Sequence, residues 1–339
     1  MSGKLYASAG VDLSAAEAAK ERIAKAVART RTEHSVGLVG AFGGMLRVPP
    51  GMQRPLLVLS TDGVGTKVLV ARAANRFDSV GEDLVNHSVN DILVHGARPL
   101  AFMDYLAGCE LSVEQIADLV EGVARACVAH GMALAGGETA QMADLYRPGD
   151  YDLAGTIVGV VEEADALHGD RIVPGDALLA YASSGLHTNG YTLARRIIAQ
   201  ELLDLGDQLP GTGRSVGDAL LEVHRSYFAA VYPLVRRMHA LAHITGGGIP
   251  GNLIRVLPEG CEAVIEASSW SVPPLFQFLQ RSGGVSAEEM RNVFNLGVGL
   301  IAVLPEREVS PAQQAAREAG VETWIIGHIA AGSRSVGFA

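Results

Sequence analysis

Acidic side chains and glycines follow an apolar run at residues 56–59, and their types suit a nucleotide site. The run stops at Thr61-Asp62-Gly63-Val64-Gly65-Thr66-Lys67. Carboxylates hold divalent metals, and glycines let backbone N–H groups approach phosphate. Asp62 would therefore bind Mg²⁺, and Lys67 would meet phosphate oxygens as a point charge. A tight Asp-Gly turn is the simpler alternative, but such a turn needs no second glycine followed by Thr and Lys.

A helix expected over residues 82–95 carries further candidates. Its apolar residues recur at helical spacing, yet Asn90 and Asp91 stand within it, and both residue types compete for backbone hydrogen bonds. Asp83 and Asp91 are eight residues apart, so they lie within about 80° of each other on a helix. Asp91 is the better candidate for catalysis or metal binding and Asp83 the weaker; a surface position is the alternative.

Three other segments combine glycines with polar side chains. Residues 136–139 (GGET) follow an expected strand, with a β-turn as the alternative. Residues 183–190 (SSGLHTNG) lie between an expected strand and helix, where hydroxyls and N–H groups favour an anion site and His187 could transfer a proton or bind substrate. Residues 245–248 suggest a second phosphate cradle. They begin a formal G-x-G-x-x-G pattern, but Pro250 within it argues against a dinucleotide site.

Composition limits the class of protein. The chain has 339 residues, 48% of them hydrophobic and 19% charged, which predicts a globular fold of about two domains. A net charge of −10 without a basic cluster argues against nucleic acid as a partner. Three scattered cysteines suit a reducing compartment, and no apolar run reaches the roughly 18 residues of a membrane span. Since no signal peptide is recognised either, we expect a cytoplasmic enzyme.

Helical and strand patterns alternate along the chain, which predicts an α/β (α+β) fold. A polar, turn-rich stretch after residue 161 places the boundary between domains 1–168 and 169–339. We expect helices over 13–29 (with Ser14 as N-cap), 82–95, 112–130 (with Ser112 as N-cap), 190–200, 220–240 and 273–280. We expect strands over 56–60 (buried), 99–106, 132–135, 151–161, 177–182, 263–265 and 298–304.

With these residues in view, the chain resembles the phosphoribosylformylglycinamidine cyclo-ligase family almost from end to end. The likeness begins at AGVDLSAAE (from Ala9) and GAFGG (from Gly40). It continues through TDGVGTK, DLVNHSVNDILVHGARPL, GGETAQM, YDLAGTIVGVVE and SSGLHTNGY, and closes with AHITGGGIPGNLIRVLP and FNLGVGL. The Asn-Asp…Gly-Ala-x-Pro element also occurs in related kinases and synthetases, whereas the combination of DGVGTK, GGETA, SSGxHTNGY and HITGGG is more specific.

The resemblance implies a reaction and an architecture. ATP phosphorylates the formyl amide oxygen of formylglycinamidine ribonucleotide, the amidine nitrogen closes the ring, and ADP and phosphate leave. Mg²⁺ is implied, and a monovalent cation such as K⁺ is left open. The implied partner is a second copy of the chain, because family members are homodimers whose N-terminal sheets join into one barrel. The implied C-terminal domain packs helices on a mixed sheet.

The implied roles fall on the following residues. Asp91 and His187 are the catalytic candidates, and Asp62, Asp91 and Glu138 are the candidate metal ligands. The ATP region would comprise Asp62, Gly63, Gly65, Thr66, Lys67, Asp83, Asn90, Gly136, Gly137, Glu138 and Thr139. The substrate and its phosphate would be held by Gly43, Gly44, Ser183, Ser184, Gly185, Asn189, Thr245, Gly246, Gly247 and Gly248.

The chain also departs from the family pattern. Many members have a lysine where this chain has Ala7, and another directly after Arg-Ile, where this chain has Ala24 and only then Lys25. A lysine shifted by one residue turns about 100° around a helix, which puts its nucleotide contact in doubt. Two other functions stay open: a related ATP-dependent phosphotransferase, which the SSGLHTNGY and HITGGG loops argue against, and a silent nucleotide-binding homologue, which the retained Asp62, Asp91 and His187 argue against.

Overall fold

The structure, a computed structural model, describes residues 13–37 and 43–339 and divides the chain into two compact units. The first unit comprises residues 1–88 and 99–160, and the second comprises residues 89–98 and 161–339. The predicted division lay between residues 168 and 169. Ala7 and residues 40–42 of the GAFGG segment lie outside the described residues.

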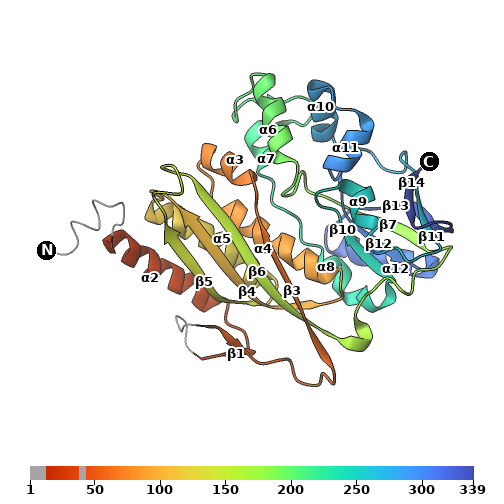
Figure 1. Cartoon of the computed structure of the whole chain (residues 1–339), viewed down its shortest axis with the longest axis horizontal. Coiled ribbons are helices and arrows are strands. Elements are labelled where there is room, and N and C mark those ends of the chain that lie inside the picture. Colours follow the sequence, from red (N-terminus) through yellow and green to blue (C-terminus); the bar gives the residue numbers. More distant parts are fainter. Residues whose placement is uncertain (1–12, 38–42) are drawn as a thin grey trace. The chain divides into compact units, whose positions relative to one another are not determined.

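The first unit is built on a four-stranded sheet in the order β3-β6-β4-β5, in which β4 and β5 run parallel (Figure 1). Helix α2 packs against α5, and α5 contacts β5. The elements are α2 (Leu13–Arg29), β1 (Ser35–Val36), β2 (Met45–Leu46), β3 (Pro55–Gly63), α3 (Lys67–Ala73), α4 (Asp78–Leu93), β4 (Arg98–Gly108), α5 (Val113–Ala129), β5 (Ala133–Gln141) and β6 (Tyr151–Glu162). Helix α4 passes from the first unit into the second after Ser88.

The second unit contains a six-stranded mixed sheet in the order β10-β12-β7-β13-β11-β14. Its strands are β7 (Ala177–Ala182), β10 (Ala240–His243), β11 (Cys261–Ile265), β12 (Val298–Leu304), β13 (Thr323–Ala331) and β14 (Ser335–Phe338); β8 (Gln208–Leu209) and β9 (Arg214–Ser215) form a separate pair. Its helices are η1 (Glu163–Asp165), α6 (Tyr191–Gln200), α7 (Val216–Leu220), α8 (Phe228–Val231), η2 (Tyr232–Arg237), α9 (Gly248–Leu253), α10 (Pro274–Gly283), α11 (Ala287–Val293) and α12 (Glu306–Glu318).

Strand β7 shows how this sheet is buried on both faces. Every residue of β7 is buried, and alternate residues enter different apolar clusters: Leu179 and Tyr181 on one side, Leu178 and Ala180 on the other. Side chains alternate between the two faces of a strand, so β7 separates two cores. A continuous apolar strand rather than an alternating one is the pattern that such a central position requires.

The α/β class is confirmed, and so are helices α2, α5 and α6 and strands β4, β6, β7 and β12 within a residue or two of the expected bounds. Ser112 caps α5 as expected: its hydroxyl accepts from Gln115 N, and Gln115 Oε1 accepts from Ser112 N, which completes a capping box. Ser14 is not an N-cap, because α2 already begins at Leu13.

Three expectations on secondary structure were wrong. Strand β3 is not buried; Leu57 and Leu59 are 55% and 63% exposed on a strand at the edge of its sheet. Residues 220–240 form no continuous helix, since residues 221–227 are irregular and only the short α8 and η2 follow. Gly136 and Gly137 do not follow a strand but lie within β5. No helix in the described part of the chain is long and apolar enough to cross a membrane.

Candidate functional site

Asp62 lies at the carboxyl end of β3, and its carboxylate is fixed from two sides. Oδ1 accepts a hydrogen bond from Gly63 N at 2.7 Å, and Oδ2 lies 2.8 Å from His87 Nε2 of α4. The side chain is nonetheless 48% exposed, so the group is held without being shut away from a ligand. A fixed, exposed carboxylate of this kind is suited to a hard cation such as Mg²⁺.

Lys67 and Asp83 form a buried ion pair. Lys67 Nζ lies 2.7 Å from Asp83 Oδ2, and neither side chain is exposed to solvent. Both charges are compensated inside the protein, where an unpaired charge would be costly. This placement differs from the sequence-based expectation that Lys67 faces phosphate: in this structure the pair joins the start of α3 to α4.

A cavity of about 550 Å³ lies within the first unit, beside α2, the β1–β2 pair and β5. Its volume is in the range of small-molecule sites. Ala24, Val27 and Leu134 contribute apolar lining. The residues predicted from sequence that line it are Gly43, Gly44, Gly136, Gly137, Glu138 and Thr139. Among the described residues, Asp62, Lys67 and Asp83 lie outside this lining.

Asp104, which sequence analysis did not select, adds a carboxyl group to the cavity. Burial disfavours its charged form and raises its pKa to about 6. A Cβ at Gly137 would collide with Asp104 Oδ1, so a glycine is needed beside this carboxyl group. The available signal was an acid inside an otherwise apolar strand, residues 99–107.

Positions 24 and 25 of α2, the family's lysine position and the lysine position of this chain, point in different directions. Ala24 lines the cavity, whereas Lys25 is exposed and pairs with Glu21 at 2.9 Å. Successive residues of a helix point about 100° apart. Lys25 therefore does not replace a lysine at position 24.

In the second unit, Asp91 is paired with a histidine that the sequence analysis did not select. His243 Nδ1 lies 2.8 Å from Asp91 Oδ1. The Asp91 side chain is 23% exposed and that of His243 only 4%, so a buried ring holds a carboxylate that still reaches solvent. His243 ends β10 and is separated from residues 245–248 by Ile244 alone. This position beside a Gly-rich segment was the signal that could have identified it.

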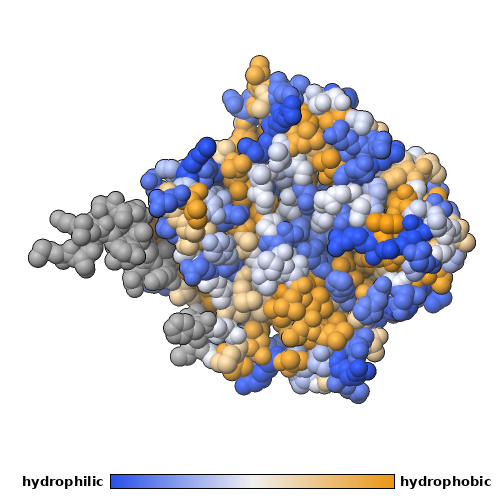
Figure 2. All heavy atoms as spheres, in the orientation of Figure 1, coloured by the Kyte–Doolittle hydropathy of each residue, from blue (hydrophilic) through white to orange (hydrophobic). Residues whose placement is uncertain are grey.

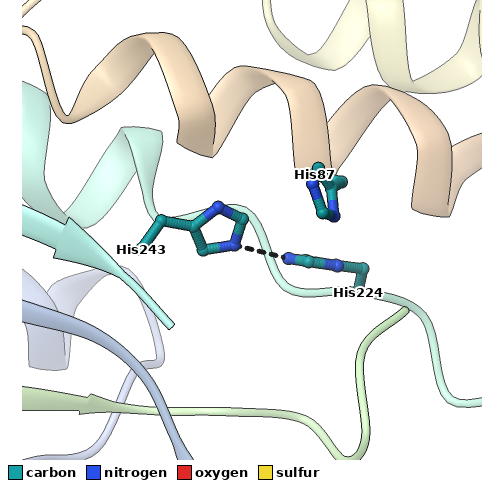
Figure 3. Close-up of side chains that lie close together, drawn as sticks. All are labelled: His87, His224 and His243. Atoms are coloured by element: carbon teal, nitrogen blue, oxygen red, sulfur yellow. Dashed lines mark hydrogen bonds between the residues drawn. The ribbon is translucent and has the colours of Figure 1, made fainter. Parts of the chain in front are cut away.

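His224 extends this pair. Its Nε2 lies 3.1 Å from His243 Nε2, which Figure 3 shows as a dashed line. It also lies 3.2 Å from Asn90 Nδ2. Asn90 is fully buried; its Oδ1 accepts from Tyr227 N at 2.9 Å, and its Nδ2 donates to Arg225 O at 2.8 Å. Asn90 therefore anchors the irregular segment 221–227 that carries His224.

His187 is buried against the same cluster. Its ring stacks on that of His224, with centroids 3.9 Å apart and an interplanar angle of 22°. Ser184 N donates to His187 Nε2 at 3.1 Å, so a neutral His187 carries its proton on Nδ1. Its φ of +62° is rare for a residue with a Cβ and marks a strained turn. The structure thus joins Asp91 and His187, the two predicted catalytic residues, through His243 and His224.

The two predicted phosphate loops adjoin in the second unit, where a Cβ at Gly246 would lie 3.3 Å from Asn189 Oδ1. The serine hydroxyls are used within the protein: Ser183 Oγ donates to Gly185 O or Asn295 Oδ1, and Ser184 Oγ donates to Val223 O.

Residues 245–248 are held as firmly as the serine loop. Asn252 Nδ2 lies within hydrogen-bond distance of three carbonyl oxygens of this segment. Gly248, at φ +60°, sits so close to Arg291 O that a Cβ would collide with it. These contacts fix the two loops and use the serine hydroxyls within the protein.

Comparison with known proteins accounts for both halves of the chain. The protein-family model described as "AIR synthase related protein, N-terminal domain" matches residues 43–161. The one described as "AIR synthase related protein, C-terminal domain" matches residues 173–339. The solved structure of a thiamine-monophosphate kinase from Stenotrophomonas maltophilia K279a covers 95% of both chains with a TM-score of 0.70 at 21% identity. The hydrogenase maturation protein HypE in complex with ATP covers 94% of this chain and 90% of its own, with a TM-score of 0.63 at 19% identity. These distant structures share the fold.

Closer relatives define the family. A phosphoribosylformylglycinamidine cyclo-ligase from Myxococcus xanthus (strain DK1622) is 47% identical over 334 residues, 97% of each chain. Another from Sorangium cellulosum (strain So ce56) is 46% identical over 329 residues, 96% of this chain and 94% of its own. With close to half of its residues identical to such proteins across both halves, the chain belongs to the phosphoribosylformylglycinamidine cyclo-ligase family of enzymes.

Proposed function

We propose that this protein cyclises formylglycinamidine ribonucleotide to 5-aminoimidazole ribonucleotide at the expense of ATP, in purine biosynthesis. The observation that carries the proposal is the 47% identity to a named cyclo-ligase over 97% of both chains. The same alignment length excludes a relation through only one domain.

The cavity of the first unit is the proposed nucleotide pocket. It offers apolar lining for a base, and two positions without a Cβ, Gly44 and Gly137, at which the backbone packs closely. The hydrogenase maturation protein HypE, which shares this fold, has been solved in complex with ATP. Glu138 in the lining supplies carboxylate oxygens, the ligand type that Mg²⁺ prefers, and so fits that ion, whereas Asp62 lies outside this lining. When bound, Mg²⁺ would neutralise charge on the transferring phosphoryl group.

The cluster in the second unit is proposed to handle the substrate. An amide oxygen is a poor leaving group. Transfer of the γ-phosphoryl group of ATP to this oxygen allows it to leave as phosphate. The amidine nitrogen then attacks the activated carbon, loses a proton, and displaces phosphate. Asp91 would accept that proton, since its carboxylate is partly exposed and His243 orients it, and the buried His187 would support the loop that meets the substrate.

A homodimer is proposed from the exposed apolar side chains of the first unit. Leu57 and Leu59 of β3 and Tyr105 of β4 are each more than 40% exposed. Figure 2 shows apolar residues reaching the surface between hydrophilic areas in the view drawn. An edge strand with outward leucines invites pairing with another sheet, and a second copy would cover it. A cytoplasmic location remains a prediction from sequence.

The deciding experiment measures ADP release by the purified protein with Mg-ATP and formylglycinamidine ribonucleotide. The product is detected in parallel as an aromatic amine. We expect ADP and aminoimidazole ribonucleotide in a one-to-one ratio, and no ADP without the ribonucleotide. Nucleotide binding without product would contradict the proposal and would favour another acceptor or a silent homologue.

A further inference from the structure

His224 lies between His243, which orients the proposed proton acceptor Asp91, and His187. It is fully buried in the irregular segment 221–227, where neither a helix nor a strand fixes its side chain. One edge of its ring meets His243, and one face of its ring stacks on His187. His243 in turn holds Asp91.

We propose that His224 is a positioning residue of the reaction, which fixes His243 against Asp91 and keeps His187 in its buried turn. The inference rests on the proposed function, because it assigns a task to Asp91 and His187. His224 does not itself reach the substrate in this scheme. It acts through the two histidine rings that it contacts.

The hydrogen-bond partners of His243 explain why a positioning residue is needed. Its Nδ1 faces the Asp91 carboxylate at 2.8 Å, and its Nε2 faces His224 at 3.1 Å. A buried ring nitrogen without a partner is unfavourable, so each contact helps to select the orientation of the ring. Removing the nitrogen of residue 224 would take away the contact at His243 Nε2, and with it one of the contacts that orient the ring against the Asp91 carboxylate.

His224 is itself positioned by contacts with Asn90 and Thr188. Asn90 approaches its Nε2 at 3.2 Å while bonding the backbone at Arg225 and Tyr227. Thr188 Oγ1 lies 3.5 Å from its Nδ1. Asn90 and Asp91 are neighbours in the chain, so one turn of α4 fixes both ends of the series Asn90, His224, His243 and Asp91. A chain of oriented groups of this kind is a known way to set the direction of a reacting carboxylate.

The simpler interpretation is a core histidine that only stabilises the fold. His239 offers a matched control for that interpretation. It lies in the same unit and pairs with Asp176 through Nδ1, the ring nitrogen through which His243 pairs with Asp91. A core histidine would affect stability without changing how Asp91 acts. A positioning residue must show coupling to His243.

The test is a double-mutant cycle on turnover, with His224→Phe, His224→Gln, His243→Gln and the pair His224→Phe/His243→Gln, and with His239→Gln as control. Phe keeps the ring and its stacking on His187 but cannot hydrogen-bond, whereas the amide of Gln can. We expect His224→Phe to lower kcat by about 10- to 100-fold with the KM for ATP unchanged, and His224→Gln to recover most of it. In the His243→Gln background, adding His224→Phe should lower kcat by less than about 3-fold further, because both substitutions remove the same contact.

A second readout does not depend on turnover. The ¹⁵N resonances of the His243 ring report its tautomer and hydrogen bonding, and we expect them to shift in His224→Phe or His224→Gln but not in His239→Gln. Additive losses in the cycle, or unshifted His243 resonances, would overturn the inference. If His224→Phe does not fold, the His243 ring resonances of His224→Gln still test the inference. A wild-type protein that makes no aminoimidazole ribonucleotide would instead contradict the proposed function.

Discussion

The two ends of strand β10 carry almost the same pair of side chains. Before the strand, His239 Nδ1 lies 2.7 Å from Asp176 Oδ2; at its last residue, His243 Nδ1 lies 2.8 Å from Asp91 Oδ1. The exposure of the partners is reversed. Asp176 is 4% exposed and His239 19%, whereas Asp91 is 23% exposed and His243 4%.

This reversal separates a structural pair from a functional candidate. Asp176 also accepts a hydrogen bond from Val173 N at 3.0 Å, so its carboxylate holds the turn that leads into β7. Asp91 instead presents a carboxylate to solvent from a buried support. Two pairs of equal geometry can therefore differ in role according to which partner remains accessible.

The largest effect is expected from Asp91→Asn, compared with Asp176→Asn. Asn keeps the shape of the side chain but cannot accept a proton, so turnover should fall by about 10²- to 10⁴-fold. Asp176→Asn should leave kcat within a few-fold. Steady-state ADP release under identical conditions measures both, and a near wild-type rate for Asp91→Asn would falsify the role given to that carboxylate.

The histidines should show the same contrast at a smaller scale. We expect His243→Gln to reduce kcat by about 10- to 100-fold, because the variant keeps Asp91 but loosens its orientation. His239→Gln should leave turnover unchanged. An equal loss of kcat in the two variants would contradict the distinction between a functional and a structural pair.

The order should reverse for stability. Asp176→Asn weakens two hydrogen bonds to a buried carboxylate and should lower the free energy of unfolding by about 1–3 kcal/mol. Asp91 is partly solvated, so Asp91→Asn should cost under about 1 kcal/mol. Urea denaturation followed by circular dichroism tests this order; a larger loss for Asp91→Asn would contradict the distinction.

Asp104 extends the comparison to a carboxyl group that has no histidine partner among the described residues. Burial raises its pKa from 3.8 to about 6, so the folded state binds a proton more tightly than the unfolded state does. The group therefore destabilises the fold increasingly as pH rises from 3.8 to 6, and fully above 6. Asp104→Asn should raise the thermal midpoint at pH 7 to 8 and have little effect near pH 3.5. Thermal scans across pH test this; a gain that is independent of pH would contradict it.

Sequence patterns predicted the regular elements well where periodicity and caps agree. The Ser112 cap and the apolar run of β7 are such cases, because local chemistry alone determines them. Leu57 and Leu59 misled the prediction, since an apolar run indicates burial but does not say whether the same chain or another molecule covers it. The segment 221–227 was also missed; its conformation depends on hydrogen bonds from Asn90, which lies far away in sequence.

The candidate site could be predicted only in part for a similar reason. Glycines and acids near strand ends indicated Asp62 and the loop of His187, and a polar residue inside an apolar helix indicated Asp91. These signals are local. His224 carries no local signal: it acquires its role from contacts with residues 90, 187 and 243. Lys67 had a local signal, but its partner Asp83 is one element away, and only the folded chain shows that the pair is buried.

The passage of α4 between the two units has a practical consequence for dissecting this protein. Residues 89–98 belong to the second unit although residues 99–160, which follow them, belong to the first. A fragment that starts at residue 161 would therefore lack Asn90 and leave the N–H of Tyr227 and the carbonyl of Arg225 without that partner. Expression of the C-terminal half as an independent module therefore requires grafting this ten-residue segment onto residues 161–339. A single cut between residues 160 and 161 does not separate the two units.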